Sequence, residues 1–126
     1  MNISIEENDG YLLVTLRGQF NTSWAPPAAE KIFGRLRGPD PEEPIEKDCI
    51  IDLRGVDYMS SGALRILVSI HKKMDADGRK MVLIRPNDMV SELLTVSGLY
   101  HFFEIRPSLE AAAGLLSPTP PASGGE

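Results

Sequence analysis

The stretch CIIDLRGVDYMSSGALRIL, Cys49–Leu67, decides how the rest of the chain can be organised. It begins within the segment DCIIDL, whose unbroken apolar run is typical of a strand buried on both faces of a sheet. Two serines and a glycine follow, and a helix is predicted from about Ser61 to Asp77, ending near Gly78. KMVLI, residues 80–84, predicts a second buried strand, so the region forms one right-handed strand–helix–strand unit.

On the N-terminal side, alternating apolar residues in MNISIEE and YLLVTLRGQ predict two paired strands. The turn signal Asn8-Asp9-Gly10 between them indicates a β-hairpin. Leu12, Val14 and Leu16 would then share one face of the second strand.

A first helix is predicted after this hairpin and before the central strand. Pro26 and Pro27 are tolerated only in the first turn of a helix, so the helix must begin just before them. Thr22 or Ser23 can cap it there. The helix would run through Leu36 to Gly38, and the acidic, proline-containing loop 39–48 would follow.

The C-terminal third predicts a helix capped by Asn87 or Asp88 and continuing to about Val96. HFFEI, residues 101–105, predicts a short last strand, and Ser108 opens a final helix, SLEAAAGLL. The order β-β-α-β-α-β-α-(β)-α predicts one α/β domain over residues 1–116, with a mixed sheet of about four or five strands and about four helices. Residues 117–126, SPTPPASGGE, have the composition of a disordered tail.

Composition limits the compartment and the classes of ligand. The chain has 126 residues, 42% hydrophobic and 25% charged, which suits a single domain with its own core. The lone Cys49 cannot form an internal disulfide and predicts a buried residue in a reducing compartment. No signal peptide or membrane span is predicted, so we expect a cytoplasmic protein. A net charge of −5 without a basic block argues against direct nucleic-acid binding.

The sequence offers no recognised catalytic or metal-binding pattern. No Gly-x-Ser-x-Gly motif surrounds Ser60 or Ser61, and no glycine-rich loop ends in Gly-Lys-Ser/Thr. His71 and His101 are the only histidines, and no metal ligands stand at a recognised spacing. We therefore predict a protein that is not an enzyme and holds no cofactor or metal.

The helix after the serines has two faces of different character. Its predicted core face comprises Ala63, Ile66, Leu67, Ile70 and Met74. Leu64 and Val68 fall near the opposite side, with Ser61 and Arg65. Either these two apolar residues meet a neighbouring helix or scatter harmlessly, or they form a docking surface for a partner.

The serines have two interpretations as well. Serine is a favoured helix N-cap. A helix N-terminus also stabilises an added phosphate, which would place a new charge beside a partner.

The stretch Cys49–Leu67 resembles the signature of STAS domains, which occur in bacterial anti-sigma factor antagonists and in sulfate transporters. Gly18-Gln19-Phe20-Asn21 resembles the Gly-Glu-Leu-Asp that follows the family's second strand. VSELLTVSGLYHFFEIRPSLEAAAGLL, residues 90–116, resembles its closing helix, Ser-Gly-Leu, strand and helix.

The resemblance implies the STAS fold, with helices packed on one side of a small mixed sheet. It also implies an anti-sigma factor antagonist that works by partner switching. The unmodified protein would bind an anti-sigma factor that is also a serine kinase, phosphorylation at the start of the second helix would end binding, and a phosphatase would restore it. The oligomeric state stays open between monomer and weak dimer. The residues implied in partner binding are Asn21, Tyr58, Met59, Ser60, Ser61, Gly62, Leu64, Arg65 and Val68.

The phosphate acceptor depends on the alignment with the family pattern Asp-Ser-Ser/Thr-Gly, which carries the phosphate on its third residue. Without a gap, Ser60 stands at the Asp, Ser61 at the first Ser and Gly62 at the acceptor. A one-residue deletion would make Ser61 the acceptor but would shift every apolar position of the helix. We favour the ungapped alignment and consider Ser61 a better acceptor than Ser60, because Ser61 lies on the predicted open side.

A second function stays open. Because the usual acceptor hydroxyl is missing, the protein could instead be a constitutive STAS subunit without a phosphate cycle. Such a subunit would scaffold a larger, stressosome-like assembly or serve a lipid-transport complex.

Overall fold

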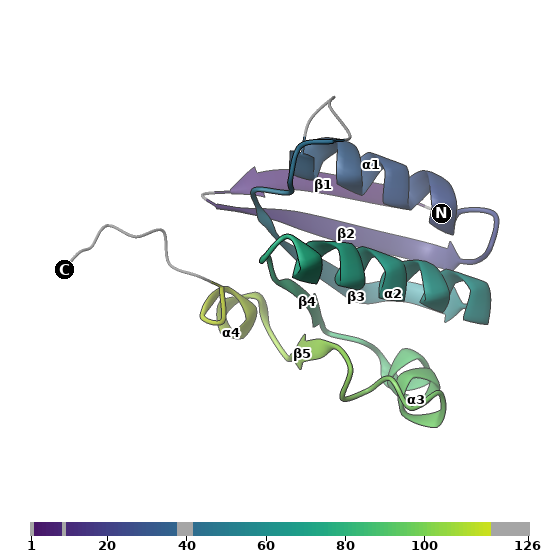
Figure 1. Cartoon of the computed structure of the whole chain (residues 1–126). Coiled ribbons are helices and arrows are strands. Elements are labelled where there is room, and N and C mark those ends of the chain that lie inside the picture. Colours follow the sequence, from purple (N-terminus) through teal and green to yellow (C-terminus); the bar gives the residue numbers. More distant parts are fainter. Residues whose placement is uncertain (1, 9, 38–41, 117–126) are drawn as a thin grey trace.

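A computed structural model describes residues 2–8, 10–37 and 42–116 of the chain (Figure 1). Within these residues five strands form one sheet in the order β1-β2-β3-β4-β5. The strands are β1 (Asn2–Asn8), β2 (Tyr11–Phe20), β3 (Asp48–Met59), β4 (Met81–Ile84) and β5 (Glu104–Arg106). The helices are α1 (Ala25–Arg37), α2 (Ser61–Ala76), α3 (Asp88–Val96) and α4 (Leu109–Ala113).

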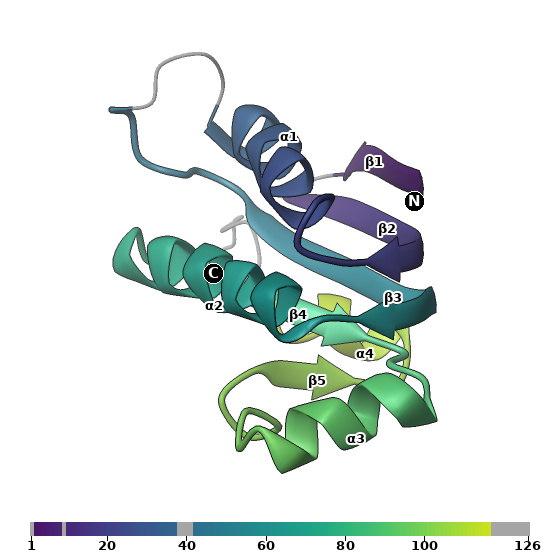
Figure 2. The same cartoon turned by 90° about the vertical axis from the view of Figure 1, so that its right-hand side faces the viewer.

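The sheet is mixed, as the order of elements predicts. β1 pairs antiparallel with β2, which confirms the hairpin, and the other neighbouring pairs from β2 to β5 are parallel. Because parallel strands end at the same edge of a sheet, β2, β3 and β4 deliver the starts of α1, α2 and α3 to one end of the molecule (Figure 2).

The larger hydrophobic core lies between the sheet and α1, α2 and α3. Leu12, Val14 and Leu16 of β2 are fully buried in it, which confirms their predicted shared face. The opposite face holds a smaller cluster, in which Ala112 of α4 packs with Ile50 and Val82. The implied arrangement, with all helices on one side of the sheet, is therefore wrong for α4.

Several boundaries differ from the predicted ones. β3 continues past Leu53 to Met59, because its second half pairs with the end of β2. α1 begins only at Ala25, so Thr22 and Ser23 lie in the turn before it and do not cap it. The caps of the last two helices, Asn87 and Ser108, are confirmed: their side chains accept hydrogen bonds from Val90 N and Ala111 N.

Some predictions fall outside the described residues. They concern position 9 of the hairpin turn, the end of the first helix at Gly38, the start of the acidic loop at 39–41 and the tail 117–126. Within the described part of the chain, every helix is too short or too polar to cross a bilayer.

Cys49 lies at the start of β3 and is fully buried, as its apolar setting predicts. Burial, with a smaller effect from the charge of the neighbouring Asp48, raises the pKa of the Cys49 thiol to about 12.

The burial of Cys49 can be tested by thiol labelling. Because the thiolate is the reactive form, we expect a thiol reagent at pH 8 to leave the folded protein unmodified and to label it once denaturant is added. Free cysteine under both conditions is the control for the reagent. Labelling of the folded protein at the rate of free cysteine would contradict this burial.

Candidate functional site

The site predicted at the serine pair lies where β3 ends and α2 begins. Ser60 has an extended backbone, with φ −84° and ψ 162°, and its Oγ accepts a hydrogen bond of 3.0 Å from Ala63 N. Its own N–H donates to Phe20 O at 3.1 Å, which ties the junction to the end of β2. Ser60 is therefore the N-cap of α2, and its hydroxyl is already engaged.

Ser61 is the first residue of α2 and is exposed. Among the described residues its hydroxyl makes no hydrogen bond. The first N–H groups of a helix have no partner within the helix and carry partial positive charge. A phosphate placed on the Ser61 hydroxyl would therefore meet a favourable field.

Gly62 lies against the side chain of Thr22, which comes from the loop between β2 and α1. A Cβ added at Gly62 would lie 2.5 Å from Thr22 Oγ1, far inside van der Waals contact. The same Thr22 Oγ1 lies 3.3 Å from Ser60 Oγ. The space for a side chain at position 62 is thus taken by the hydroxyl of Thr22.

Asn21, also predicted to meet a partner, has a local structural role in this loop. Its Oδ1 accepts hydrogen bonds from Ser23 N at 3.0 Å and from Trp24 N at 3.1 Å. These bonds fix the turn that leads into α1 and hold Thr22 over the junction.

Two other predicted contact residues are buried. Met59 is 3% exposed and Leu64 is 4% exposed, and both belong to the main core. Val68 is half-buried and packs against the same core. The first of the two predicted alternatives is therefore confirmed: Leu64 and Val68 meet a neighbouring helix. That helix is α1, which packs beside α2 and brings Ile32 into the same cluster, so Leu64 does not lie on the solvent face.

An open groove of about 480 Å³ adjoins the junction on the side of α3. From the junction it is lined by Tyr58, which is 49% exposed, by Ser61 and by the largely buried Met59. From α3 it is lined by Met89, Glu92, Leu93 and Val96, and Val96 is 78% exposed. Arg65, also predicted at the site, is exposed on α2.

The α3 residues were missed by the sequence analysis, although a signal for them exists. Met89, Leu93 and Val96 stand at i, i+4 and i+7, which is the spacing of one helix face. Val90 and Leu94 form the buried face of the same helix. A helix this short with apolar residues on two faces predicts that one of the faces is left without an intramolecular partner.

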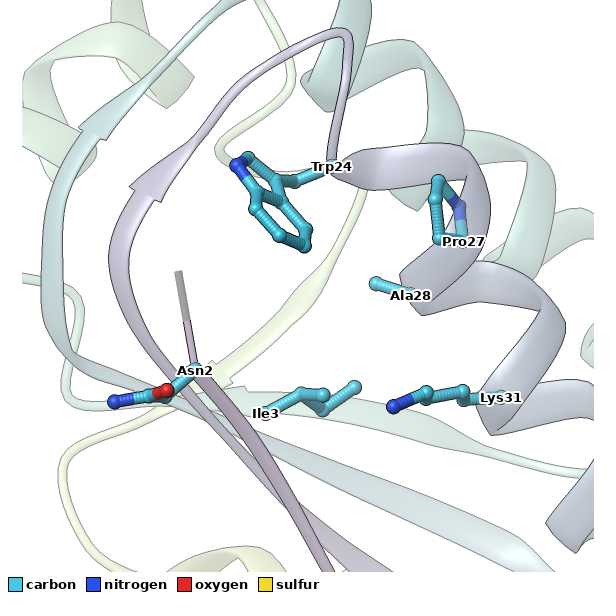
Figure 3. Close-up of a pocket in the computed structure, with 6 residues that line it drawn as sticks. All are labelled: Asn2, Ile3, Trp24, Pro27, Ala28 and Lys31. Carbon is cyan, nitrogen blue, oxygen red and sulfur yellow. The ribbon is translucent and has the colours of Figure 1, made fainter.

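A second hollow, of about 210 Å³, lies on the other side of the junction between the start of α1 and the edge strand β1 (Figure 3). Trp24, which is 48% exposed, stands over it, with Ile3 and Pro27 among its other walls. The side chain of Lys31 points across it toward Ile3 (Figure 3).

The chain matches a known protein family and a related bacterial protein. The sequence model of the STAS domain matches residues 2–112. A protein of Bordetella bronchiseptica, the candidate anti-sigma factor antagonist BtrV, is 26% identical over 113 residues, which cover 90% of this chain and 92% of that protein.

Solved structures share the fold. The crystal structure of a candidate anti-sigma factor antagonist from Thermotoga maritima matches with a TM-score of 0.78 at 18% identity, over 90% of this chain and 93% of that chain. The anti-sigma factor antagonist SpoIIAA in its unphosphorylated form matches with a TM-score of 0.72 at 15% identity, over 92% and 100% of the two chains.

The contact between Thr22 and Gly62 can be tested by stability. We expect Gly62→Ala to lower the free energy of unfolding by about 1–3 kcal/mol, because the new methyl group overlaps Thr22 Oγ1. In a Thr22→Ala background the same change should cost far less, since the overlapping oxygen is gone. Denaturant unfolding of the four proteins measures this coupling.

Gly34 provides the matched control, since it lies in α1 and an added Cβ there meets no atom within 4 Å. Gly34→Ala should therefore stabilise the protein by roughly 0.5–1 kcal/mol. Equal effects at positions 34 and 62 would contradict the steric assignment.

Proposed function

The chain belongs to the STAS domain family, and from that membership we propose that it is an anti-sigma factor antagonist controlled by phosphorylation of Ser61. Support for the antagonist role comes from the description of its Bordetella relative. Support for the control comes from one observation: the free Ser61 hydroxyl lies at the rim of an exposed apolar groove. In this role the protein acts by binding, and its own residues catalyse no step.

The partner would dock on the groove between the junction and α3. Tyr58 offers an exposed aromatic side chain, and Val96 and Met89 add apolar surface beside it. Aromatic and apolar side chains gathered in a hollow are typical anchors of protein interfaces. In this proposal the partner is an anti-sigma factor, which releases its sigma factor when it binds here.

Phosphorylation would end this contact through charge. A kinase of the anti-sigma factor type would transfer the terminal phosphoryl group of ATP to Ser61 Oγ, leaving ADP. The phosphate adds about −1.5 to −2 charges at neutral pH. The N-terminus of α2 stabilises that charge, so the fold is kept. A partner that packs on the groove would then have to remove water from the phosphate, which is costly. The carboxylate of Glu92, which also lines the groove, adds a second negative charge there. A phosphatase that removes the phosphate would restore binding.

Ser60 is the poorer acceptor of the pair. Its Oγ already accepts the capping hydrogen bond from Ala63 N and lies 3.3 Å from Thr22 Oγ1. Ser60 is half-buried, whereas Ser61 is exposed, so a kinase reaches the Ser61 hydroxyl more readily.

The contact between Thr22 and Gly62 favours a second candidate function. In the ungapped alignment Gly62 stands at the family's acceptor position, and Thr22 leaves no room there for a serine or threonine. A protein that has lost the acceptor would bind its partner permanently, as a constitutive STAS subunit. The same groove would then serve as its docking surface, without a phosphate cycle.

Mass spectrometry of the protein from its own cells separates the two functions. We expect an adduct of one phosphate on the peptide that contains Ser61, and its loss in Ser61→Ala. Ser69→Ala is the matched control, because Ser69 is an exposed serine two turns along the same helix. An adduct that persists in Ser61→Ala would reject Ser61 as the acceptor. Absence of any adduct in every growth phase would reject the phosphate cycle and leave the constitutive subunit.

The docking surface can be tested with the partner protein. Immobilised wild-type protein should retain from its own cells a serine kinase that also binds a sigma factor. Titration calorimetry with that purified kinase should then show a loss of affinity of about tenfold or more for Tyr58→Ala and for Ser61→Asp. Tyr100→Ala, at an exposed tyrosine that does not line the groove, should bind as the wild type does. Equal affinities for Tyr58→Ala and Tyr100→Ala would place the partner elsewhere.

A further inference from the structure

The face of the sheet opposite α1 and α2 is covered only in part. α4 packs there over Ile50, Val82 and Ile84. One row of register partners crosses the sheet from Thr15 to Asp52, Ile84 and Arg106. From this row toward the ends of the strands, side chains of the same face lie open to solvent. A pocket of about 240 Å³ lies there, lined by Thr15, Arg17, Asp52, Arg54 and Gly55.

Arginine side chains gather around this pocket from separate strands. Arg17 of β2 and Arg54 of β3 line it and are exposed. Within the described residues neither of them forms an ion pair or a side-chain hydrogen bond. Arg85 follows β4 and reaches Asp52, with 3.5 Å between Nη2 and Oδ2. Asp52 is thus the one acidic residue that lines the pocket, and it pairs with Arg85, while Arg17 and Arg54 have no acidic partner among the described residues.

Arg85 carries an unused donor. Its Nε is buried and has no hydrogen-bond partner. A buried donor without a partner is costly, so it indicates a missing acceptor. Arg85 also has φ 55°, a backbone conformation that residues with side chains rarely adopt. The chain thus maintains a strained residue here, which is common at binding sites.

The arginines are held in place by their surroundings. A Cβ on Gly55 would lie 2.9 Å from Arg17 Cγ, so the glycine lets the Arg17 stem lie across β3. Asp52 Oδ1 accepts a hydrogen bond of 3.0 Å from Arg54 N and is itself 6% exposed. The site is built on paired strands, which keeps the charged groups at fixed spacing.

From these observations we propose that this pocket binds a phosphate group. The planar guanidinium fork matches the oxygens of a phosphate, and a dianion balances the uncompensated charges of Arg17 and Arg54. Thr15 adds a hydroxyl donor at the pocket wall. The pocket, of about 240 Å³, has room for a phosphate group and part of the molecule that carries it.

The phosphate can come from two sources that share this chemistry. One is a small phosphomonoester, and the other is a phosphorylated serine of another polypeptide. The site lies on the opposite face of the sheet from α2 and is independent of the function proposed for the groove at Ser61.

The first test is an NMR titration of the ¹⁵N-labelled full chain with inorganic phosphate at constant ionic strength. We expect saturable shifts of the amides at residues 15–17 and 52–55, with a dissociation constant of about 1 mM or lower. The double variant Arg17→Gln/Arg54→Gln should bind at least tenfold more weakly. Arg65→Gln, an exposed arginine on α2, is the matched control and should leave the constant unchanged.

Two outcomes would overturn the proposal. One is a set of shifts that sodium chloride reproduces at equal ionic strength, and the other is an unchanged constant in the double variant. Spectral dispersion shows whether the double variant is folded; if it is not, Arg54→Gln alone replaces it, with an expected loss of severalfold.

A second titration distinguishes the sources. Free O-phosphoserine and a short peptide containing phosphoserine are compared with the same peptide containing glutamate. Tighter binding of the phosphopeptide supports a polypeptide source, and equal binding of free phosphoserine supports a small molecule. If the glutamate peptide binds as tightly as the phosphopeptide, the pocket recognises an acidic peptide and the phosphate proposal is overturned.

Discussion

The pairing of β3 between β2 and β4 is the constraint on which the rest of the structure depends. The first half of β3 is buried on both faces, and Cys49, Ile51 and Leu53 are fully buried in the main core. The second half extends beyond β4, whose register with β3 ends at Asp52 and Ile84. This overhang, paired only with β2, carries the serine junction out to the end of the sheet.

The overhang also explains the groove. Beyond β4 the edge of β3 would present unpaired backbone groups. The side chain of Asn87, which caps α3, donates a hydrogen bond of 2.6 Å to Val56 O and covers part of that edge. α3 is thereby held beside β3, and Met89, Leu93 and Val96 come to face the same hollow as Tyr58. A single strand that is longer than its neighbour thus positions both the serines and the surface next to them.

The two faces of the sheet present different chemistry at the same end of the molecule. On the helical face, an apolar groove adjoins a free hydroxyl at the start of α2. On the opposite face, α4 covers Ile50 and Val82 but leaves Arg17 and Arg54 in the open. The sheet separates these surfaces, because α2 and α3 lie on one face while Thr15, Asp52 and Arg54 alternate onto the other. Each surface can therefore be tested by substitutions that leave the other intact.

Much of this protein was determined by the sequence itself. Alternation in β2, the unbroken apolar run of β3 and the caps Asn87 and Ser108 act within a few residues of chain, so the strands and helices follow from local rules. The same local rules identify Ser60 as a helix cap. The motif in Cys49–Leu67 also carried enough information to indicate the family.

Tertiary structure decided which side chains remain available. The phase of α2 left Leu64 on an apparently open side, and only the packing of α1 beside it shows that the residue is buried. The fold also brings Arg17, Arg54 and Arg85 together from three parts of the chain, although no basic run exists in the sequence. Helix periodicity reports how residues are arranged around one element. Burial and charge clustering depend on which elements meet, and that is set by the pairing and crossing of segments far apart in the chain.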